Sequence, residues 1–467
     1  MPVALRICVL VGLALIAALR FWPRNAPPSP PPPIPPGATF WHVTDWHLNL
    51  FHDRHGDVRD MCRSETADAS RWPGAFGHFN CDPSRQFAEA AVAQMAAAHP
   101  QPAFIVLGGD DFGHVPPSRE DASSVRASHE AMRELLRARF PDTPVLPIVG
   151  NHDTWPYFSA QGTASLSQLY ATLWGDALGA RAKRQLARRG YYAFDPPAAP
   201  GLRVLALETN AFALVSAGWS EQLDWVEEAL GAAAAANRSV VVVGHIAPGG
   251  SHTDWNSIAA VGWAGGCWRP KPQRRLYASL RRWRATVRAL FFGHLHTPSV
   301  RLLRAAGGAA ASAARPGDEA MPVSYLSPSL TPRNPTPHPP AVRLYALGAD
   351  GAPVDAWDHA IDLDASNAAG ALAWRVSSLR EALGLASLGA GSWWRWLGAL
   401  HDDASFGAHM SGQRCADEVE PGYAECKASE LCAMRELEDD AYKACLADVR
   451  RDARPPAGWA PGTKRKP

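Results

Sequence analysis

Metal-binding side chains stand directly after several short apolar stretches of this sequence. In most cases glycine precedes them, and the side chains are aspartate, asparagine or histidine. Histidine combined with carboxylate suits zinc, manganese or iron, whereas carboxylate alone would suit magnesium or calcium. The candidate ligands are Asp45, His47, Asp110, Asn151, His245, His294 and His296.

The spacing of these residues favours a site for two metal ions. Asp45 and His47, like His294 and His296, stand two positions apart, so each pair lies on one side of an extended segment. Glycines before the other candidates allow sharp backbone turns. Two cations roughly 3.5–4 Å apart need a bridging anion, which a single aspartate can supply.

The apolar stretches that carry these residues have the length of β-strands, and helical patterns separate them. The pattern predicts helices over 84–98 and 125–140, and a third helix with Ser220 as its N-cap. Strands alternating with helices indicate an α/β fold, in which ligands bind at the carboxyl ends of the strands. The predicted strands are 40–44, 103–107, 145–149, 202–207, 240–243 and 289–292.

Composition shifts divide the chain into five segments. Residues 1–22 have a basic start and an apolar run over 7–19, which is typical of a signal peptide. An uncleaved signal anchor is the alternative, although a spanning helix needs about 20 apolar residues. A proline-rich spacer over 23–37 follows. The folded segments are then a main domain at 38–360 and a helical subdomain at 361–450, before a flexible tail at 451–467.

The balance of charge limits the classes of partner. The 46 lysines and arginines nearly equal the 45 aspartates and glutamates, which argues against a nucleic-acid duplex as partner. Trp393 and Trp396 lie at helical spacing on one predicted face, as expected for ordinary packing. Trp394 lies off that face, so its region and the N-terminal anchor are the candidate membrane contacts. We expect a monomer.

Five motifs in order resemble the calcineurin-like metallophosphoesterases, and among them most closely the acid sphingomyelinase-like phosphodiesterases. They include FWHVTDWHLN at 40–49, VGNHDTWP at 149–156 and GHLHTPSV at 293–300, with Gly109-Asp110 and GHIAPG at 244–249 between them. The likeness extends from about residue 39 to 447. It implies a four-layer αββα sandwich with a small C-terminal helical subdomain held by disulfides.

The resemblance also implies a role for each candidate. One zinc ion would be held by Asp45, His47 and His296, the other by Asn151, His245 and His294, with Asp110 bridging the two. A water shared by the two zinc ions would lose its proton and attack the phosphate ester. His152 or His114 would protonate the leaving group, and the sequence leaves open which one does so. Asp153 would orient a neighbour rather than bind metal.

The cysteines follow the same family with one departure. The resemblance implies bridges from Cys62 to Cys81 and from Cys432 to Cys445. Family members place a further pair only four residues apart, but Gly422 stands at that distance from Cys426, so Cys415 is the predicted substitute. Cys267 has no evident partner. Disulfides and the glycosylation motif at Asn237 suit a secreted or lysosome-like lumenal protein.

The predicted substrate class depends on what accompanies the catalytic domain. Sphingomyelinase itself carries a lipid-presenting saposin-type module, whereas here only the proline spacer precedes the domain. We therefore expect hydrolysis of small soluble phosphodiesters or nucleotide-type pyrophosphates. Hydrolysis of sphingomyelin to release phosphocholine is the alternative.

Overall fold

The computed structural model describes ten stretches of the chain. They are 37–115, 118, 120–214, 216–250, 267–306, 314–333, 339–400, 406, 423–435 and 439–452. The predicted signal or anchor, nearly all of the proline spacer, Cys415 and most of the predicted tail lie outside these residues. Within them, no helix combines the length and the apolar character needed to cross a bilayer.

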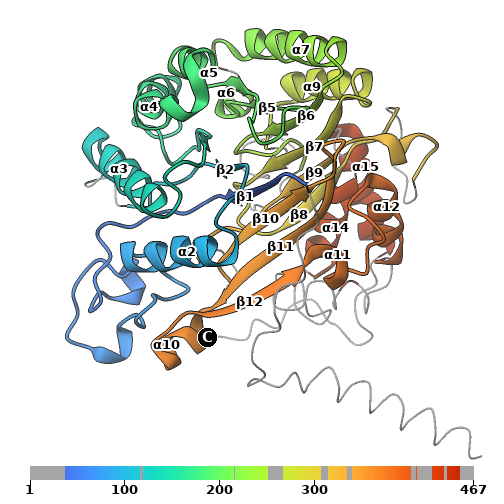
Figure 1. Ribbon diagram of the computed structural model, residues 1–467. Coiled ribbons are helices and arrows are strands. Elements are labelled where there is room, and N and C mark those ends of the chain that lie inside the picture. Colours follow the sequence, from blue (N-terminus) through green and yellow to red (C-terminus); the bar gives the residue numbers. More distant parts are fainter. Residues whose placement is uncertain are drawn as a thin grey trace, which may run out of the picture.

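The described strands form two six-stranded sheets that pack face to face (Figure 1). The first sheet has the order β12-β11-β10-β1-β2-β3, and the second has the order β4-β5-β6-β7-β9-β8. Strands of the first sheet are β1 (Thr39–Val43), β2 (Phe104–Leu107), β3 (Val145–Pro147), β10 (Ala341–Leu347), β11 (Pro353–Asp362) and β12 (Ala373–Ser378). Strands of the second are β4 (Tyr192–Phe194), β5 (Leu202–Ala206), β6 (Ser239–Val243), β7 (Val287–Phe292), β8 (Ser299–Leu302) and β9 (Val323–Leu326).

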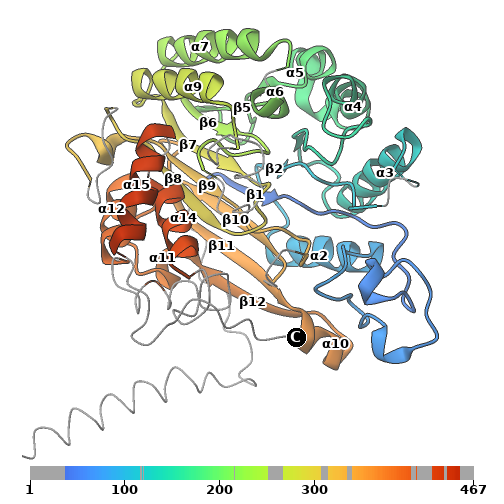
Figure 2. The same cartoon turned by 180° about the vertical axis from the view of Figure 1, so that it is seen from behind.

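Helices cover the outer faces of both sheets and one flank of the molecule. In Figure 1, α7 and α9 lie over the second sheet, and Figure 2 shows α12, α14 and α15 together on the flank. The first group of helices is α2 (Arg85–Ala98), α3 (Ala122–Arg139), α4 (Ala160–Leu173), α5 (Gly175–Arg189), α6 (Asn210–Leu214), α7 (Trp219–Ala235) and α9 (Pro270–Arg282). The C-terminal group is α10 (Leu363–Ala369), α11 (Leu379–Ala382), α12 (Ala390–Ala399), α14 (Tyr423–Arg435) and α15 (Asp439–Asp452).

Alternation along the strands produces the core between the sheets. Phe40 on β1 stacks on Phe104 at 4.8 Å and meets Phe291 of the other sheet edge-on at 5.1 Å. Its neighbour Trp41 faces the opposite side, toward the helices, because successive strand residues alternate between faces. The result is an α/β sandwich of two sheets between helices, as the resemblance implies.

The predicted strands and helices are close to those observed, with two corrections. The Ser84 hydroxyl caps α2 by accepting a hydrogen bond from the Phe87 amide. The third helix begins two residues earlier than predicted, with Gly218 rather than Ser220 at its N-cap. The segment at 361–450 is not purely helical, because β12 pairs along β11 and extends the first sheet. A six-residue segment has too few turns for periodicity to outweigh pairing with a neighbouring strand.

The C-terminal region contradicts the expected role of Trp394. Its side chain is only 3% exposed, and the Arg304 guanidinium lies 4.4 Å from the centre of its ring. Trp394 itself is therefore a packing residue rather than an exposed ring. The bridges Cys62–Cys81 and Cys432–Cys445 are both formed, as the resemblance implies. Cys426 is disulfide-bonded too, although its predicted partner lies outside the described residues.

Candidate metal centre

The seven candidate ligands meet where the carboxyl ends of the two sheets come together. Asp45 follows β1 of the first sheet and His294 follows β7 of the second, yet the His294 amide donates to the Asp45 carboxylate at 2.9 Å. Five of the seven have a positive φ, among only nine such non-glycine residues in the described parts of the chain: Asp45, His47, Asp110, His294 and His296. Strained backbone of this kind costs about 1–3 kcal/mol per residue and concentrates at functional sites.

Asp45, His47 and His296 form the first cluster. The Nε2 atoms of His47 and His296 lie 3.1 Å apart, and Nε2 of His296 lies 3.4 Å from an Asp45 oxygen. Both Nδ1 atoms face backbone carbonyl oxygens, His47 that of Phe112 at 3.1 Å and His296 that of Arg333 at 3.0 Å. Nδ1 must carry the proton to donate to a carbonyl. Two Nε2 lone pairs and a carboxylate therefore face one another.

A second cluster contains Asp110, Asn151, His245 and His294. Nδ1 of His245 donates to the Gly108 carbonyl at 2.9 Å, so Nε2 is the nitrogen that faces the other members of the cluster. That atom lies 3.1 Å from an Asp110 oxygen and 3.1 Å from Oδ1 of Asn151. Nδ1 of His294 is buried without a hydrogen-bond partner among the described residues, and His294 groups with Asp110 and His245 as a possible metal site.

Converging acceptors of this kind need a cation between them. A proton on His245 can partly replace this cation, and the raised pKa of His245 is consistent with such a proton. Burial alone would lower that pKa, but the charge of Asp110 raises it to about 10. A metal ion relieves the repulsion at both clusters, and the nitrogen and oxygen donors suit zinc. Asp110 lies between the clusters, 3.1 Å from His245 and 3.8 Å from His47, as a bridging carboxylate must.

Asp153 holds the loops that carry Asp110 and Asn151. Its carboxylate accepts hydrogen bonds of 2.7–3.0 Å from four backbone amides, those of Asp110, Asp111, Phe112 and Gly150. The side chain is fully buried and its lone pairs are occupied. Asp153 therefore acts through backbone geometry, as expected from the sequence.

His114 and His152 lie beside the clusters. The His114 ring stacks on the His47 ring at 3.9 Å and meets His152 at 4.4 Å. The Nδ1 atom of His114 lies 3.1 Å from both oxygens of Asp82, and its backbone amide donates to the same carboxylate at 2.6 Å. Burial lowers the pKa of His152 to about 4, so this ring is neutral near pH 7.

Two residues of this neighbourhood escaped the sequence interpretation. Asp82 directly follows Cys81, whose disulfide fixes that loop, and its contact with His114 spans 32 positions of the chain. Tyr157 is 47% exposed, its hydroxyl lies 3.4 Å from Nδ2 of Asn151, and its ring lies 5.0 Å from that of His152. Tyr157 could have been found from the sequence, because it lies in the loop that carries the predicted ligand Asn151.

Comparisons with known proteins agree with this geometry. The family model described as calcineurin-like phosphoesterase matches residues 38–298. The chain is 28% identical to human (Homo sapiens) acid sphingomyelinase-like phosphodiesterase 3b, over 87% of the chain and 90% of that protein. It is 25% identical to cyclic GMP-AMP phosphodiesterase SMPDL3A of Rattus norvegicus, over 90% of the chain and 94% of that protein. It is 24% identical to sphingomyelinase phosphodiesterase C of Dictyostelium discoideum, over 88% of the chain and 93% of that protein.

Proposed function

This chain belongs to the calcineurin-like phosphoesterase family and is a metal-dependent phosphoric diester hydrolase, and from that premise we propose that it uses two zinc ions to hydrolyse small soluble phosphodiesters or nucleotide-type pyrophosphates. The observation that carries the proposal is the convergence of histidine Nε2 atoms and carboxylates in two adjoining clusters. Asp45, His47 and His296 would hold one ion, Asn151, His245 and His294 the other, and Asp110 both.

Zinc ions held there would lower the pKa of a bound water and neutralise charge on the phosphoryl oxygens. The protein's own part is to orient the phosphate and to supply a proton to the leaving group. We assign that proton to His114, because Asp82 occupies its Nδ1 and leaves Nε2 to meet a substrate. His152, neutral near pH 7, would donate a hydrogen bond to a phosphoryl oxygen instead.

Aromatic groups beside the centre support a nucleotide-type substrate. Tyr157 holds a half-exposed ring next to His152, and Trp155 in the same loop is 38% exposed. A nucleobase can stack on such rings for roughly 1–3 kcal/mol. The SMPDL3A relative, named a cyclic GMP-AMP phosphodiesterase, supports the same class. These exposed rings could also meet a lipid, and with the relative named a sphingomyelinase they make sphingomyelin the second candidate.

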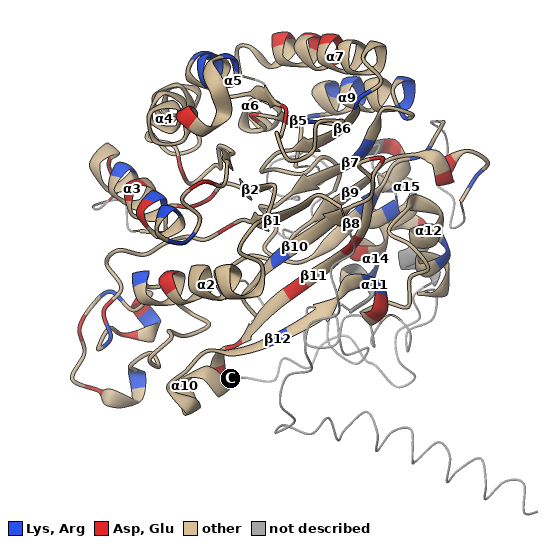
Figure 3. Cartoon of the chain, in the orientation of Figure 1, with Lys and Arg blue, Asp and Glu red and all other residues tan. Residues whose placement is uncertain are grey.

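The charge distribution favours small substrates over a nucleic-acid duplex. Figure 3 shows the basic residues of α9 beside the acidic residues of α7. Arg282 pairs with Glu227 at 2.8 Å, and Arg275 pairs with Asp224. The acidic helix thus compensates two basic residues of α9, whereas a duplex binder needs an uncompensated positive face.

The disulfides support a location outside the reducing cytosol. Bridges such as Cys62–Cys81 persist in the secretory pathway and outside the cell. We therefore propose that the protein is secreted or lumenal. Its action as a monomer, and contact with a membrane through the N-terminal segment, remain proposals.

The deciding experiment measures metal content and turnover on the same protein. The full chain, expressed through a secretory host, is assayed with bis-p-nitrophenyl phosphate, ATP, CDP-choline, cyclic GMP-AMP and sphingomyelin. The Asn151→Ala variant is the control. We expect about two zinc ions per chain, turnover of the nucleotides, and at least a hundredfold lower kcat in the variant.

Each other result has a definite meaning. Preference for sphingomyelin would replace the proposed substrate class by the second candidate while keeping the two-metal mechanism. Two bound zinc ions without turnover of any diester would refute the catalytic proposal.

A further inference from the structure

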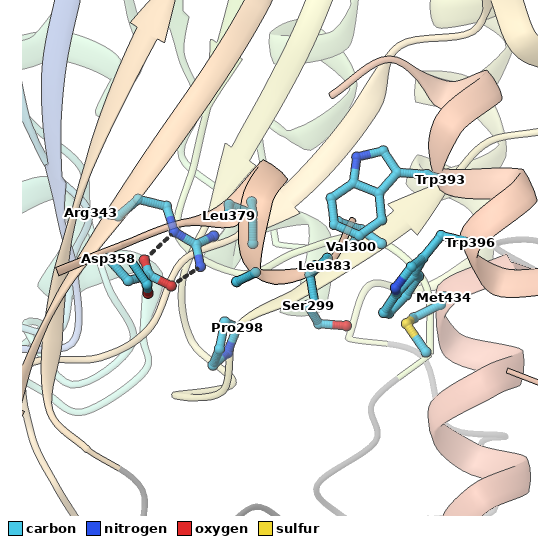
Figure 4. A pocket seen from close by; sticks show the side chains of 12 residues that line it. Pro298, Ser299, Val300, Arg343, Asp358, Leu379, Leu383, Trp393, Trp396 and Met434 are labelled. Carbon is cyan, nitrogen blue, oxygen red and sulfur yellow. Dashed lines mark hydrogen bonds and ion pairs between the residues drawn. The ribbon is translucent and has the colours of Figure 1, made fainter. Parts of the chain in front are cut away.

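A cavity lies on the inner face of the first sheet, apart from the metal centre. The second sheet ends at its edge strand β8, so the inner face of β10, β11 and β12 extends beyond it. Helices α11, α12 and α14 cover that part of the face instead. They leave a cavity of about 180 Å³ between the sheet and the helices (Figure 4).

One end of this cavity is aromatic and apolar. The rings of Trp393 and Trp396 stand nearly perpendicular, at 88°, with centroids 5.3 Å apart. Met434 from α14 and Leu383 next to α11 complete the wall. In Figure 4 the two indoles lie on one side of the hollow and the leucines lie between them and the opposite, polar side. Two crossed ring faces suit a flat apolar group.

The other end presents a carboxylate. Arg343 donates from Nε and Nη2 to the two oxygens of Asp358, at 2.6 and 2.8 Å. Its Nη1 donates to the Leu326 carbonyl and to the Tyr345 hydroxyl, each at 3.3 Å. The guanidinium is thus largely satisfied and its side chain is 2% exposed, while that of Asp358 is 20% exposed. This end of the cavity therefore offers a bound molecule mainly a hydrogen-bond acceptor, the Asp358 carboxylate.

This ion pair belongs to a polar row that crosses four strands. His42, Arg343, Asp358 and Ser377 pair in register across β1, β10, β11 and β12. Strand partners share a face, so the whole row points into the interior between the layers. Apolar residues of similar size are often as stabilising as a buried ion pair, or more so. Stability alone therefore does not account for a carboxylate at the wall of an apolar cavity.

We propose that this cavity is a second binding site, for a small amphipathic molecule with a flat apolar body and a hydrogen-bond donor as its head. The body packs against the wall that Trp393 and Trp396 form, and the head, a hydroxyl or an amine, donates to Asp358. A cavity of about 150 Å³ can hold benzene, so 180 Å³ admits a benzene ring with a small substituent. The inference does not depend on the proposed substrate class.

The test uses three probes of matched shape that differ in the head group. Benzylamine, benzyl alcohol and benzoate are titrated into the full-length, zinc-loaded protein by calorimetry. The same titrations on the Asn151→Ala protein distinguish binding in the cavity from binding at the metal centre. We expect the amine and the alcohol to bind equally well to both proteins. Binding of benzoate should be at least tenfold weaker, because the Asp358 carboxylate repels it.

Two variants test the position of the site. Trp396→Ala should raise the dissociation constant of benzylamine roughly tenfold by removing one ring face, and Leu383→Trp should abolish binding by filling the cavity. Trp72→Ala removes an exposed indole elsewhere on the molecule and should leave the dissociation constant of benzylamine unchanged. A crystal soaked with 4-bromobenzylamine should place the bromine between Leu383 and Trp396. Equal binding of benzoate, indifference to both cavity variants, or bromine at another place would each overturn the proposal.

Discussion

At the scale of single residues, backbone carbonyl oxygens determine which ring nitrogen of each histidine faces the centre. His47, His245 and His296 all use Nδ1 to reach a carbonyl, so Nε2 is the nitrogen that remains for a cation. Partners of this kind fix the tautomer and the ring orientation of metal-binding histidines. The donor set is therefore prepared before any ion arrives.

Asp82 is the residue on which the assignment of His114 can be tested. Asp82→Asn weakens the hold on the His114 ring, because an amide replaces the carboxylate that its Nδ1 and its backbone amide now contact. We expect kcat to fall roughly 10²- to 10⁴-fold with little change in KM.

A matched variant separates this role from general damage to the loop. Thr331 donates to the same carboxylate at 3.1 Å, and Thr331→Val removes that bond without touching the contact between Asp82 and His114. Its kcat should stay within about tenfold of the original. Equal losses in both variants would contradict the assignment of His114.

At the scale of elements, the carboxyl ends of β2 and β3 are joined through one buried side chain. Asp153, after β3, binds amides of the loop after β2, so the two loops that supply Asp110 and Asn151 move as one unit. Tyr170 of α4 lies beneath, with its hydroxyl 3.4 Å from the same carboxylate.

Asp153→Asn should disturb both loops together. An amide nitrogen cannot accept the hydrogen bonds that one carboxylate oxygen accepts now, and each unsatisfied buried amide costs about 1–3 kcal/mol. We expect the free energy of unfolding to fall by roughly 2–4 kcal/mol and zinc affinity to fall at least tenfold. Urea denaturation and metal titration measure the two effects. Exposed Asp142→Asn, in the loop before β3, should change stability by less than about 0.5 kcal/mol.

His359 on β11 should make the stability of the fold sensitive to acid. Burial lowers its pKa from 6.5 to about 4, despite the opposing charge of Asp358. Between these values the unfolded chain binds a proton that the folded chain does not, so stability falls as the pH falls from 6.5 toward 4. The slope is about 1.4 kcal/mol per pH unit for one such group.

The variant His359→Phe should remove this contribution. Phenylalanine keeps a ring against Trp41, which His359 meets edge-on at 4.9 Å. Between pH 6.5 and 5 the variant should lose about 2 kcal/mol less stability than the original protein. Urea denaturation of both proteins after chelation excludes pH-dependent metal loss as the cause. Parallel stability profiles would show that His359 does not titrate on unfolding.

At the scale of the whole molecule, the metal centre joins the two sheets. Asp45, His47, Asp110 and Asn151 come from the first sheet, while His245, His294 and His296 come from the second. A cation held by both groups should therefore resist separation of the sheets as well as serve catalysis. Without it, the facing acceptors repel one another.

Chelation should accordingly destabilise the fold. A ligand present at about a thousand times its dissociation constant stabilises a protein by about 4 kcal/mol. For a domain of this size we expect EDTA to lower Tm by roughly 5–10 °C and added zinc to restore it. Asn151→Ala should show a smaller shift. An unchanged Tm after metal analysis confirms removal would contradict a structural contribution of the ions.

The sequence alone was sufficient to predict what depends on local order. Each candidate ligand stands within four residues of the end of its strand, so finding the strands also placed the side chains at one edge. The Ser84 cap and the residues that α2 buries follow from neighbours within one or two helical turns. Apolar alternation and the glycine turns are likewise local signals, and they led to the α/β fold class and the candidate ligand set, whereas the two-sheet arrangement was implied by the family resemblance.

Only the tertiary structure decided what depends on distant partners. Asp82 meets His114 across 32 positions, and Arg304 covers Trp394, whose region the sequence offered as a candidate membrane contact. β12 is a strand because β11 offers it hydrogen bonds, whereas its own six residues carry little periodicity. The polar row and its cavity likewise require the register of four strands. Such contacts leave no local pattern, because the free energy that selects them comes from groups brought together by folding.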